Sequence, residues 1–263
     1  MGGPTSDFFI SADELISTFP SEDVPMVIDV RRAPAVATSG MSIPTAVWLD
    51  IADFTPLDVT GGLTEARNRA LVIHCIHGHN VSQLATSVLR ASGFTARCLA
   101  GGIEHWVQAG APVCIRDGSR PSGPLVMSLK PDAISVLDAW IVRRYLDRNI
   151  KICCVDALQV TAVADEIGGR RTASYGEAID VGEFGIVDPV LAAFVSDMVA
   201  GVRSLSGLRA AIECLWLDRS MHERRAISSG FAMLDAMYRA RRLRFHPMAL
   251  DQMTTTSEEV HGA

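Results

Sequence analysis

Cys75 is the residue of this sequence whose surroundings best suit a chemical reaction. An apolar, β-branched run over residues 71–75 predicts a buried strand with Cys75 at its carboxyl end. Residues 76–81 follow neither the strand period nor the helix period, so they form a loop. Ser82 is then a good N-cap for a helix whose apolar residues recur at helical spacing. The pattern predicts a strand, a loop and a helix, with one thiol enclosed by the loop.

Such a loop could activate the thiol and hold an anion beside it. Backbone N–H groups that lead into a helix N-terminus create positive potential, which favours the nucleophilic thiolate and binds oxyanions. We therefore expect Cys75 to act as the catalytic nucleophile. The expected substrate-binding residues are Ile76, His77, Gly78, His79, Asn80, Val81 and Ser82. The alternative is an inert thiol buried at a strand end, since free cysteine is often buried.

The charged residues near this loop could have functional or purely structural roles. His77 and His79 could bring positive charge to the thiol or contact an oxyanion, and they could equally be solvent-facing loop residues. Asp29 and Arg31 follow a second predicted strand, and we expect a salt bridge between them that orients neighbouring loops. His74 points into the sheet in the strand pattern, which favours a structural role.

The composition favours a globular protein with ample core. The 263 residues are 48% hydrophobic and 21% charged, and the net charge of −6 argues against nucleic acid as a general partner. No stretch is long and apolar enough to span a membrane, and the N-terminal residues lack the pattern of a secretory signal. We therefore expect a cytoplasmic protein without a membrane partner.

The cysteine spacing argues against a metal site. None of the six cysteines forms a Cys-x-x-Cys pair, so zinc-ligand spacing is absent and a disulfide framework is not expected. Five of the six lie in apolar or strand-like surroundings and are interpreted as core residues, which leaves Cys75 as the reactive one. We expect no metal and no cofactor.

The order of patterns along the chain predicts two domains. Strand-like runs alternate with helical ones over residues 5–115, which predicts an α/β fold with a parallel sheet and a site at the strand carboxyl ends. Residues 116–124 are polar and rich in glycine and proline, as is typical of a linker. Residues 125–246 are predicted to be mainly helical, and residues 247–263 to be a disordered tail.

The first half of the chain, roughly residues 8–113, resembles a rhodanese domain. The matching residues are Asp29-Val30-Arg31, Cys75 with Gly78, Ser82, residues 89–94, Gly101-Gly102-Ile103 with Trp106, and residues 109–112. The resemblance implies a central parallel sheet flanked by helices and a sulfurtransferase of the thiosulfate sulfurtransferase type. It further implies that Cys75 carries a persulfide, which receives sulfane sulfur from a small-molecule or protein donor and gives it to a thiol acceptor or to cyanide. Backbone N–H groups of residues 76–81 would hold the anionic persulfide.

The loop departs from the pattern of single-domain sulfurtransferases in two ways. Six residues separate Cys75 from Ser82, one more than is usual, and none of them is arginine. The longer loop is similar to that of the related dual-specificity phosphatases, but those enzymes clamp phosphate with an arginine fork. The sequence therefore disfavours phosphatase activity and weakens the case for thiosulfate as an efficient donor.

The second half, roughly residues 125–242, resembles the C-terminal domain of chromate-resistance ChrB proteins, several of which also carry a preceding rhodanese-like domain. The resemblance rests on residues 139–147, on Tyr175-Gly176-Glu177 and on residues 230–238. This chain lacks the polar and sulfur-bearing residues of that family at Ile134, Ser135, Asp138 and Ala139, and it lacks the histidine and cysteine within residues 173–179. The resemblance thus implies a degenerate ChrB-type domain.

These features support one leading function and two alternatives. The leading one is a rhodanese-like sulfurtransferase that acts through Cys75, with the ChrB-like domain as an accessory. The first alternative is a ChrB-type sensor or regulator of chromate or oxidative stress, without efficient turnover, whose basic C-terminal helices contact DNA. Its basic residues are Arg224, Arg225, Arg239, Arg241, Arg242 and Arg244, although such a run is usually a solvated helix face. The second alternative is a persulfide carrier with little turnover of its own.

Overall fold

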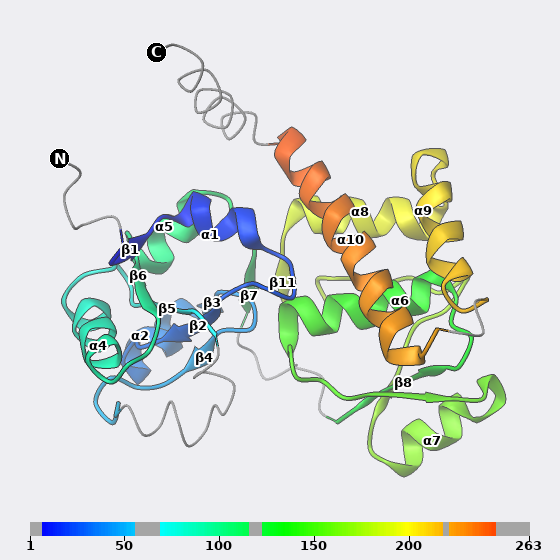
Figure 1. Ribbon diagram of the computed structural model, residues 1–263, viewed down its shortest axis with the longest axis horizontal. Helices are drawn as coiled ribbons and strands as arrows, with labels where there is room; N and C mark the ends of the chain where they lie inside the picture. The colour runs from blue at the N-terminus through cyan, green and yellow to red at the C-terminus, as the bar shows by residue number, and fades with distance from the viewer. Residues whose placement is uncertain (1–6, 56–68, 116–122, 218–220, 246–263) are drawn as a thin grey trace. The chain divides into compact units, whose positions relative to one another are not determined.

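The computed structural model describes residues 7–55, 69–115, 123–217 and 221–245 (Figure 1). The chain forms two compact units. The first comprises Met1–Arg120 with Arg144–Arg148 and Gly182–Asp188, and the second comprises Pro121–Arg143, Asn149–Val181 and Pro189–Ala263. Most of the predicted linker and all of the predicted tail lie outside the described residues. The predicted domain limits at residues 115 and 125 stay a prediction.

A five-stranded parallel sheet forms the centre of the first unit. Its strands, in spatial order, are β1 (Phe9–Ile10), β6 (Ala96–Leu99), β5 (Leu71–His74), β2 (Met26–Asp29) and β4 (Val47–Trp48). Every residue of β2 and β5 is buried, as expected for apolar strands that are covered on both faces. The predicted α/β fold with a parallel sheet is confirmed.

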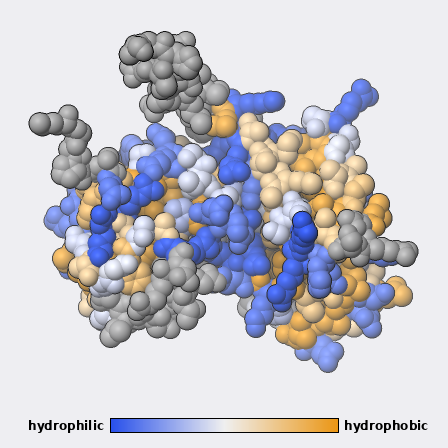
Figure 2. All heavy atoms as spheres, viewed as in Figure 1, coloured by the Kyte–Doolittle hydropathy of each residue, from blue (hydrophilic) through white to orange (hydrophobic). Residues whose placement is uncertain are grey.

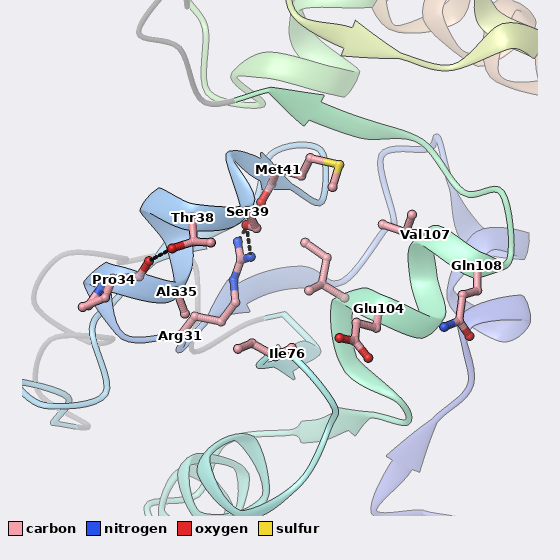
Figure 3. A pocket seen from close by; sticks show the side chains of 11 residues that line it. Arg31, Pro34, Ala35, Thr38, Ser39, Met41, Ile76, Glu104, Val107 and Gln108 are labelled. Atoms are coloured by element: carbon pink, nitrogen blue, oxygen red, sulfur yellow. Dashed lines mark hydrogen bonds between the residues drawn. The ribbon is translucent and has the colours of Figure 1, made fainter.

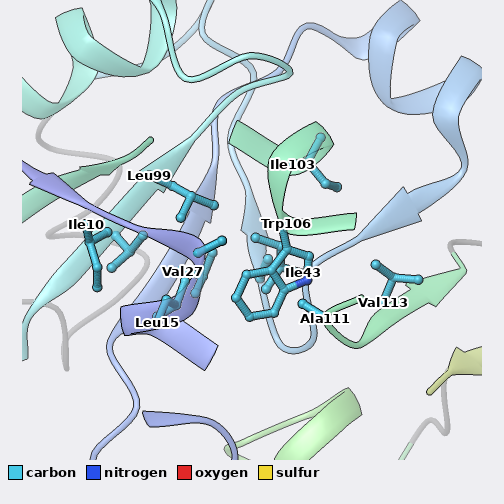
Figure 4. Close-up of a cluster of buried hydrophobic side chains, with 12 residues drawn as sticks. Ile10, Leu15, Val27, Ile43, Leu99, Ile103, Trp106, Ala111 and Val113 are labelled. Atoms are coloured by element: carbon cyan, nitrogen blue, oxygen red, sulfur yellow. The ribbon is translucent and has the colours of Figure 1, made fainter. Parts of the chain in front are cut away.

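Helices cover both faces of this sheet. They are α1 (Ala12–Thr18), α2 (Ala33–Ser39), α4 (Asn80–Ala91) and α5 (Gly102–Gln108). Alternate strand residues point to opposite faces, so Val27 and Val72 join one apolar cluster with Trp106 (Figure 4), while Ile28 and Ile73 join another. Trp106 is fully buried. Its indole N–H donates to the Pro112 carbonyl at 2.7 Å, which ties the end of α5 to the chain that follows it.

A second, antiparallel sheet in the first unit includes a strand from far along the chain. Its order is β11 (Ile186–Val187), β7 (Val113–Ile115) and β3 (Met41–Ser42). A further distant segment joins the same unit through Arg144, which pairs with Glu22 at 2.6 Å. The first unit therefore contains more than the N-terminal part of the sequence.

The second unit is mainly helical, as predicted. Its small parallel sheet has the order β10 (Arg170–Arg171), β8 (Leu125–Ser128), β9 (Ile152–Val155). Its helices are α6 (Ala133–Ile141), the 3₁₀ turn η3 (Ala157–Gln159), α7 (Val160–Glu166), α8 (Pro189–Ala200), α9 (Arg203–Cys214) and α10 (Glu223–Phe245). Helix α6 runs on into the π-helical turn η2 (Val142–Leu146), which belongs to the first unit from Arg144 onward. The Asp188-Pro189 pair predicts a helix start with proline at the first helical position, and α8 begins at Pro189.

Aromatic side chains from three helices form the core of the second unit. Trp140, Phe194 and Tyr238 pack with ring centroids 6.0–6.3 Å apart. The Trp140 indole N–H donates to Asp235 at 2.7 Å, so the buried indole keeps a hydrogen-bond partner.

No single helix in the described part of the chain is long and apolar enough to cross a membrane. Only α8 and α9 taken together, with a bend of 76° between them, reach the required length and composition. Hydrophilic and hydrophobic residues are interspersed over the face of the molecule seen in Figure 2.

Candidate functional site

Cys75 lies directly after β5, between the ends of the neighbouring strands β2 and β6. Its side chain is buried, with the residue 8% exposed. The Cys75 Sγ lies 3.2 Å from the Ser82 hydroxyl oxygen and 3.7 Å from the His79 carbonyl oxygen. A single thiol at the carboxyl edge of a parallel sheet therefore lies under the first turn of α4, which is the arrangement that the sequence predicts.

The role of Ser82 differs from the predicted one. Helix α4 begins at Asn80, and His79 is its N-cap residue without a side-chain capping bond. Ser82 instead lies buried in the first turn, where its hydroxyl donates to the His79 carbonyl at 3.1 Å and faces the Cys75 thiol. The prediction of Ser82 as N-cap is wrong because its side chain turns inward to the thiol and leaves the cap to the backbone.

The loop side chains point in different directions. Ile76 and Val81 are half-buried, Gly78 is buried, and His77, His79 and Asn80 are exposed. The His77 ring pairs with Glu104 at 2.9 Å on the surface. Among the described residues, neither histidine side chain forms a hydrogen bond with the thiol. Of the two roles left open for His77, the surface position fits this pairing.

In the backbone of the loop, carbonyl groups accept hydrogen bonds, whereas the N–H groups donate to no described residue. The Cys75 and Ile76 carbonyls accept from the N–H groups of Ile103 and Glu104 in α5, at 3.0 and 3.2 Å. In contrast, the N–H groups of residues 76–81 donate to no other residue that the structure describes. N–H groups that lead into a helix N-terminus attract negative charge, so this loop is suited to an anionic ligand.

Gly78 allows the loop to approach the turn between β6 and α5. Its φ is +71°, and a Cβ at this position would lie 2.5 Å from the Leu99 carbonyl oxygen and 2.7 Å from the Gly101 nitrogen. Backbone atoms cannot move aside as a flexible side chain can. Glycine is therefore required here for both conformation and space.

Cys98 is a neighbour of the site that sequence reasoning assigned to the core. It lies on β6 in register with Ile73 of β5, and its thiol donates to the Ser82 hydroxyl oxygen at 3.3 Å. Burial raises the pKa of the Cys98 thiol, and the nearby Cys75 adds to this, while hydrogen bonds with Ser82 and Thr86 oppose it. Cys98 is thus held as a neutral donor. Only the strand register could have revealed this proximity.

Asp29 and Arg31 form the predicted salt bridge at the end of β2. The Arg31 guanidinium bonds both Asp29 oxygens, the Ser39 hydroxyl and the Met41 carbonyl, at 2.6–3.1 Å. Burial raises the pKa of Asp29, but the hydrogen bonds from Arg31 and the charges of His74 and Arg31 outweigh it and lower the pKa from 3.8. The pair is structural, and the Arg31 guanidinium is directed to Asp29, Ser39 and Met41. His74 is fully buried, in keeping with a structural role.

A cleft of about 680 Å³ opens beside the loop, between α2 and α5 (Figure 3). Ile76, the residue after Cys75, is part of its wall. Among the described residues, no three His, Cys, Asp or Glu side chains are grouped so that they could hold a metal ion.

The part of the chain that contains this site also matches a known protein family. Residues 11–109 match the family model of the rhodanese-like domain. This part of the chain is a rhodanese-like domain. Cys75, its loop and the sheet edge all lie within the rhodanese-like domain, and the match ends before the second unit. The resemblance of the second half to ChrB proteins therefore stays a prediction.

Several solved structures are similar to the chain. One is a protein from Bacillus halodurans, with 23% identity and a TM-score of 0.37 over 42% of this chain and 78% of that chain. A rhodanese-related protein from Thermoplasma volcanium has 24% identity and a TM-score of 0.33 over 40% and 95%. A rhodanese-like domain protein from Staphylococcus aureus has 24% identity and a TM-score of 0.31 over 37% and 88%. Among curated proteins, none matches this sequence.

The second unit has its own run of backbone amides, but these are paired. The N–H groups of Ala173, Ser174 and Tyr175 donate to the carboxylates of Asp138, Glu177 and Asp132, at 2.7–3.0 Å. These three carboxylates, named here the acidic cluster, occupy the place that an oxyanion would need. The eroded oxyanion site that the ChrB resemblance implies for this segment stays a prediction.

Proposed function

We propose that the rhodanese-like domain transfers sulfane sulfur through a persulfide on Cys75, with the second unit as an accessory ChrB-like domain. The supporting observation is the open row of N–H groups at residues 76–81, which directly follows a thiol at the carboxyl end of the central strand. An anionic sulfur species in this loop would accept hydrogen bonds from N–H groups that donate to no described residue of the protein.

The proposed chemistry has two displacement steps at sulfur. The Cys75 thiolate attacks the sulfane sulfur of a donor, a new S–S bond forms, and the donor leaves with the electron pair of its broken bond. The loop N–H groups stabilise the negative charge on the resulting persulfide. A thiolate or cyanide then attacks the outer sulfur, and Cys75 leaves as the thiolate with which the cycle began. The Ser82 hydroxyl, 3.2 Å from the Sγ, can donate to that thiolate.

The donor in this proposal carries little negative charge beyond its sulfur. The described loop contains no arginine, His77 pairs with Glu104, and the guanidinium of Arg31 is bonded to Asp29. A dianion such as thiosulfate would have to rely on backbone N–H groups alone. We therefore expect an organic or protein persulfide to be a better donor than thiosulfate.

Thiocyanate formation from cyanide tests the proposal. Wild type should produce thiocyanate with a persulfide donor, and Cys75→Ser should fall to the uncatalysed background because it lacks the nucleophile. Cys214→Ser changes an exposed cysteine of the second unit and should keep full activity. Undiminished activity in the Cys75→Ser variant would contradict the proposal.

Mass spectrometry distinguishes a transferase from a carrier. A persulfide on Cys75 that accumulates and then disappears when cyanide or a thiol is added supports transfer. A stable persulfide that neither acceptor removes would instead support the carrier alternative.

The ChrB-type regulator remains the alternative of a different class. In the second unit, Arg241 pairs with Asp197 at 2.7 Å and Arg242 is buried against the Tyr238 hydroxyl at 3.0 Å. These two arginines of the predicted basic cluster thus serve internal contacts. A DNA affinity that falls steeply with salt would be needed to favour the regulator.

A further inference from the structure

The cleft beside the Cys75 loop has the size of a small-molecule site. Its volume of about 680 Å³ lies within the range of roughly 300–1,000 Å³ that is usual for such sites. One wall is α2, with Ala35 and Thr38, and the opposite wall is α5, with Glu104 and Val107 (Figure 3). Ile76 brings the reactive loop itself into the lining.

The cleft and the reactive loop are held together by backbone hydrogen bonds. The N–H groups of Ile103 and Glu104, both in the cleft wall, donate to the carbonyls of Cys75 and Ile76. A molecule seated against α5 would therefore have a defined position relative to Cys75. The same bonds use the first N–H groups of α5, so this helix start has fewer donors to offer an anion.

The charges of the lining disfavour an anionic occupant. Arg31, the only cationic residue among the described lining residues, is 2% exposed and directs its guanidinium to Asp29, Ser39 and Met41. The Glu104 carboxylate is about half exposed at the rim and pairs with His77 at 2.9 Å, so the described rim residues offer an anionic ligand no unpaired histidine. Proline, alanine, isoleucine, valine and methionine side chains supply much of the remaining surface. The lining thus fits a neutral body that is largely apolar.

We propose that this cleft binds the apolar body of a neutral thiol, which accepts sulfur from Cys75. The inference rests on the proposed sulfur transfer and names its acceptor. The bound thiol first loses its proton to solvent. The resulting thiolate attacks the outer sulfur of the Cys75 persulfide, a bond forms between these two sulfurs, and the bond to the Cys75 Sγ breaks. The products are the acceptor persulfide and the Cys75 thiolate, so atoms and electrons balance without a further reactant.

Filling the cleft tests this assignment. Ala35→Trp places a large ring in the cleft, whereas Ala37→Trp makes the same change at an exposed position of α2 outside the lining. The acceptors are phenylmethanethiol, which is neutral and apolar, and cyanide, which is too small to need the cleft. We expect Ala35→Trp to raise the KM for phenylmethanethiol about tenfold, because apolar contact is lost, and to leave the cyanide reaction unchanged.

The two acceptors separate the failure of this inference from the failure of the proposed function. Equal kinetics of Ala35→Trp and Ala37→Trp with phenylmethanethiol would overturn the cleft assignment while cyanide turnover still supports sulfur transfer. A wild type that prefers glutathione, with its two carboxylates, over phenylmethanethiol would also overturn it.

A binding measurement removes the dependence on turnover. Benzyl methyl sulfide has the same body but no reactive thiol, so its binding can be followed by NMR on the methyl groups of Ile76, Ile103 and Val107. Saturable shifts at these methyls, absent in Ala35→Trp, would support the cleft even if Cys75 proved inactive. No shift up to the solubility limit of the probe would contradict it.

Discussion

The Cys75 loop of the first unit and the segment 173–175 of the second both present consecutive backbone amides, but they differ in what receives them. In the second unit the three carboxylates of the acidic cluster accept from Ala173, Ser174 and Tyr175. In the first unit the N–H groups of residues 76–81 donate to no described residue. One segment supplies its own anions, and the other is left open for a ligand.

The difference shows how a reactive site and a structural one can use the same backbone chemistry. Asp138 is fully buried, and besides Ala173 it accepts two bonds from Arg170, at 2.9 and 3.0 Å. Such saturation stabilises the fold and excludes a further anion. The Cys75 loop lacks that stabilisation, and its N–H groups can instead stabilise negative charge on a bound sulfur atom.

Displacing the Cys75 loop should have the largest effect on sulfur transfer. Gly78→Ala places a methyl group within 3 Å of backbone atoms of Leu99 and Gly101, so the loop must shift away from the turn between β6 and α5. We expect kcat/KM for sulfur transfer to fall about a hundredfold, because misplaced N–H donors stabilise the persulfide poorly. Gly93→Ala is the matched control, since its φ of +86° carries strain but no atom lies within 4 Å. Equal activities of the two variants would show that the position of the loop is unimportant.

Opening the acidic cluster should have the next largest effect, on stability alone. Asp138→Asn removes the charge that pairs with Arg170, and we expect a loss of about 2 kcal/mol in the unfolding free energy of the second unit. Hydrogen exchange of the backbone amides of α6 measures this loss of stability. Glu177→Gln alters an exposed pair with Arg171 and should cost less than about 1 kcal/mol. Reduced cyanide turnover in a folded Asp138→Asn variant would contradict the structural role.

Acid should weaken the first unit through Asp29. Because the folded-state pKa of Asp29 lies below the ordinary value of 3.8, its carboxylate contributes stability above that pH and loses it as the pH falls toward the folded-state pKa. Asp29→Asn should flatten the slope of unfolding free energy against pH in this window by up to about 1.4 kcal/mol per pH unit. The variant starts from lower stability, so slopes are compared. Identical slopes would remove Asp29 from the acid response.

The smallest effect is expected at Cys98. Its thiol donates to the Ser82 hydroxyl oxygen, so the Ser82 hydroxyl becomes a stronger donor when it turns from the His79 carbonyl to the Cys75 thiolate. Cys98→Ala should slow iodoacetamide alkylation of Cys75 about fivefold near neutral pH, the value of one net hydrogen bond. Cys98→Ser keeps a donor and should restore the rate. An equal rate in both variants would limit Cys98 to packing.

Local sequence patterns were sufficient for the parts of the fold that depend on local periodicity. The apolar runs predict β2 and β5, and the Asp188-Pro189 pair predicts the start of α8, because these signals lie within a few residues. Cys75 follows from the same reasoning, since a thiol at a strand end before a loop is visible in the sequence.

The missed features depend on contacts between distant residues. Cys98 meets Ser82 only because β5 and β6 pair in a particular register, and the Ser82 hydroxyl then lies 3.2 Å from one thiol and 3.3 Å from the other. The cleft requires α2 and α5 to lie on either side of Ile76. None of these relations has a signature in a short window of sequence.

Because β7 pairs with β11, two neighbouring strands of one sheet are synthesised at widely separated times. The ribosome releases residues Val113–Ile115 long before Ile186–Val187, and two segments of the second unit, Pro121–Arg143 and Asn149–Val181, are made in between. Until then one edge of β7 has unpaired N–H and carbonyl groups, which can recruit a strand from another nascent chain. A fragment that stops near residue 115 would keep that edge of β7 unpaired. A soluble rhodanese-like fragment should therefore include residues Ile186–Val187 as an added strand, rather than end directly after the residues of the family match.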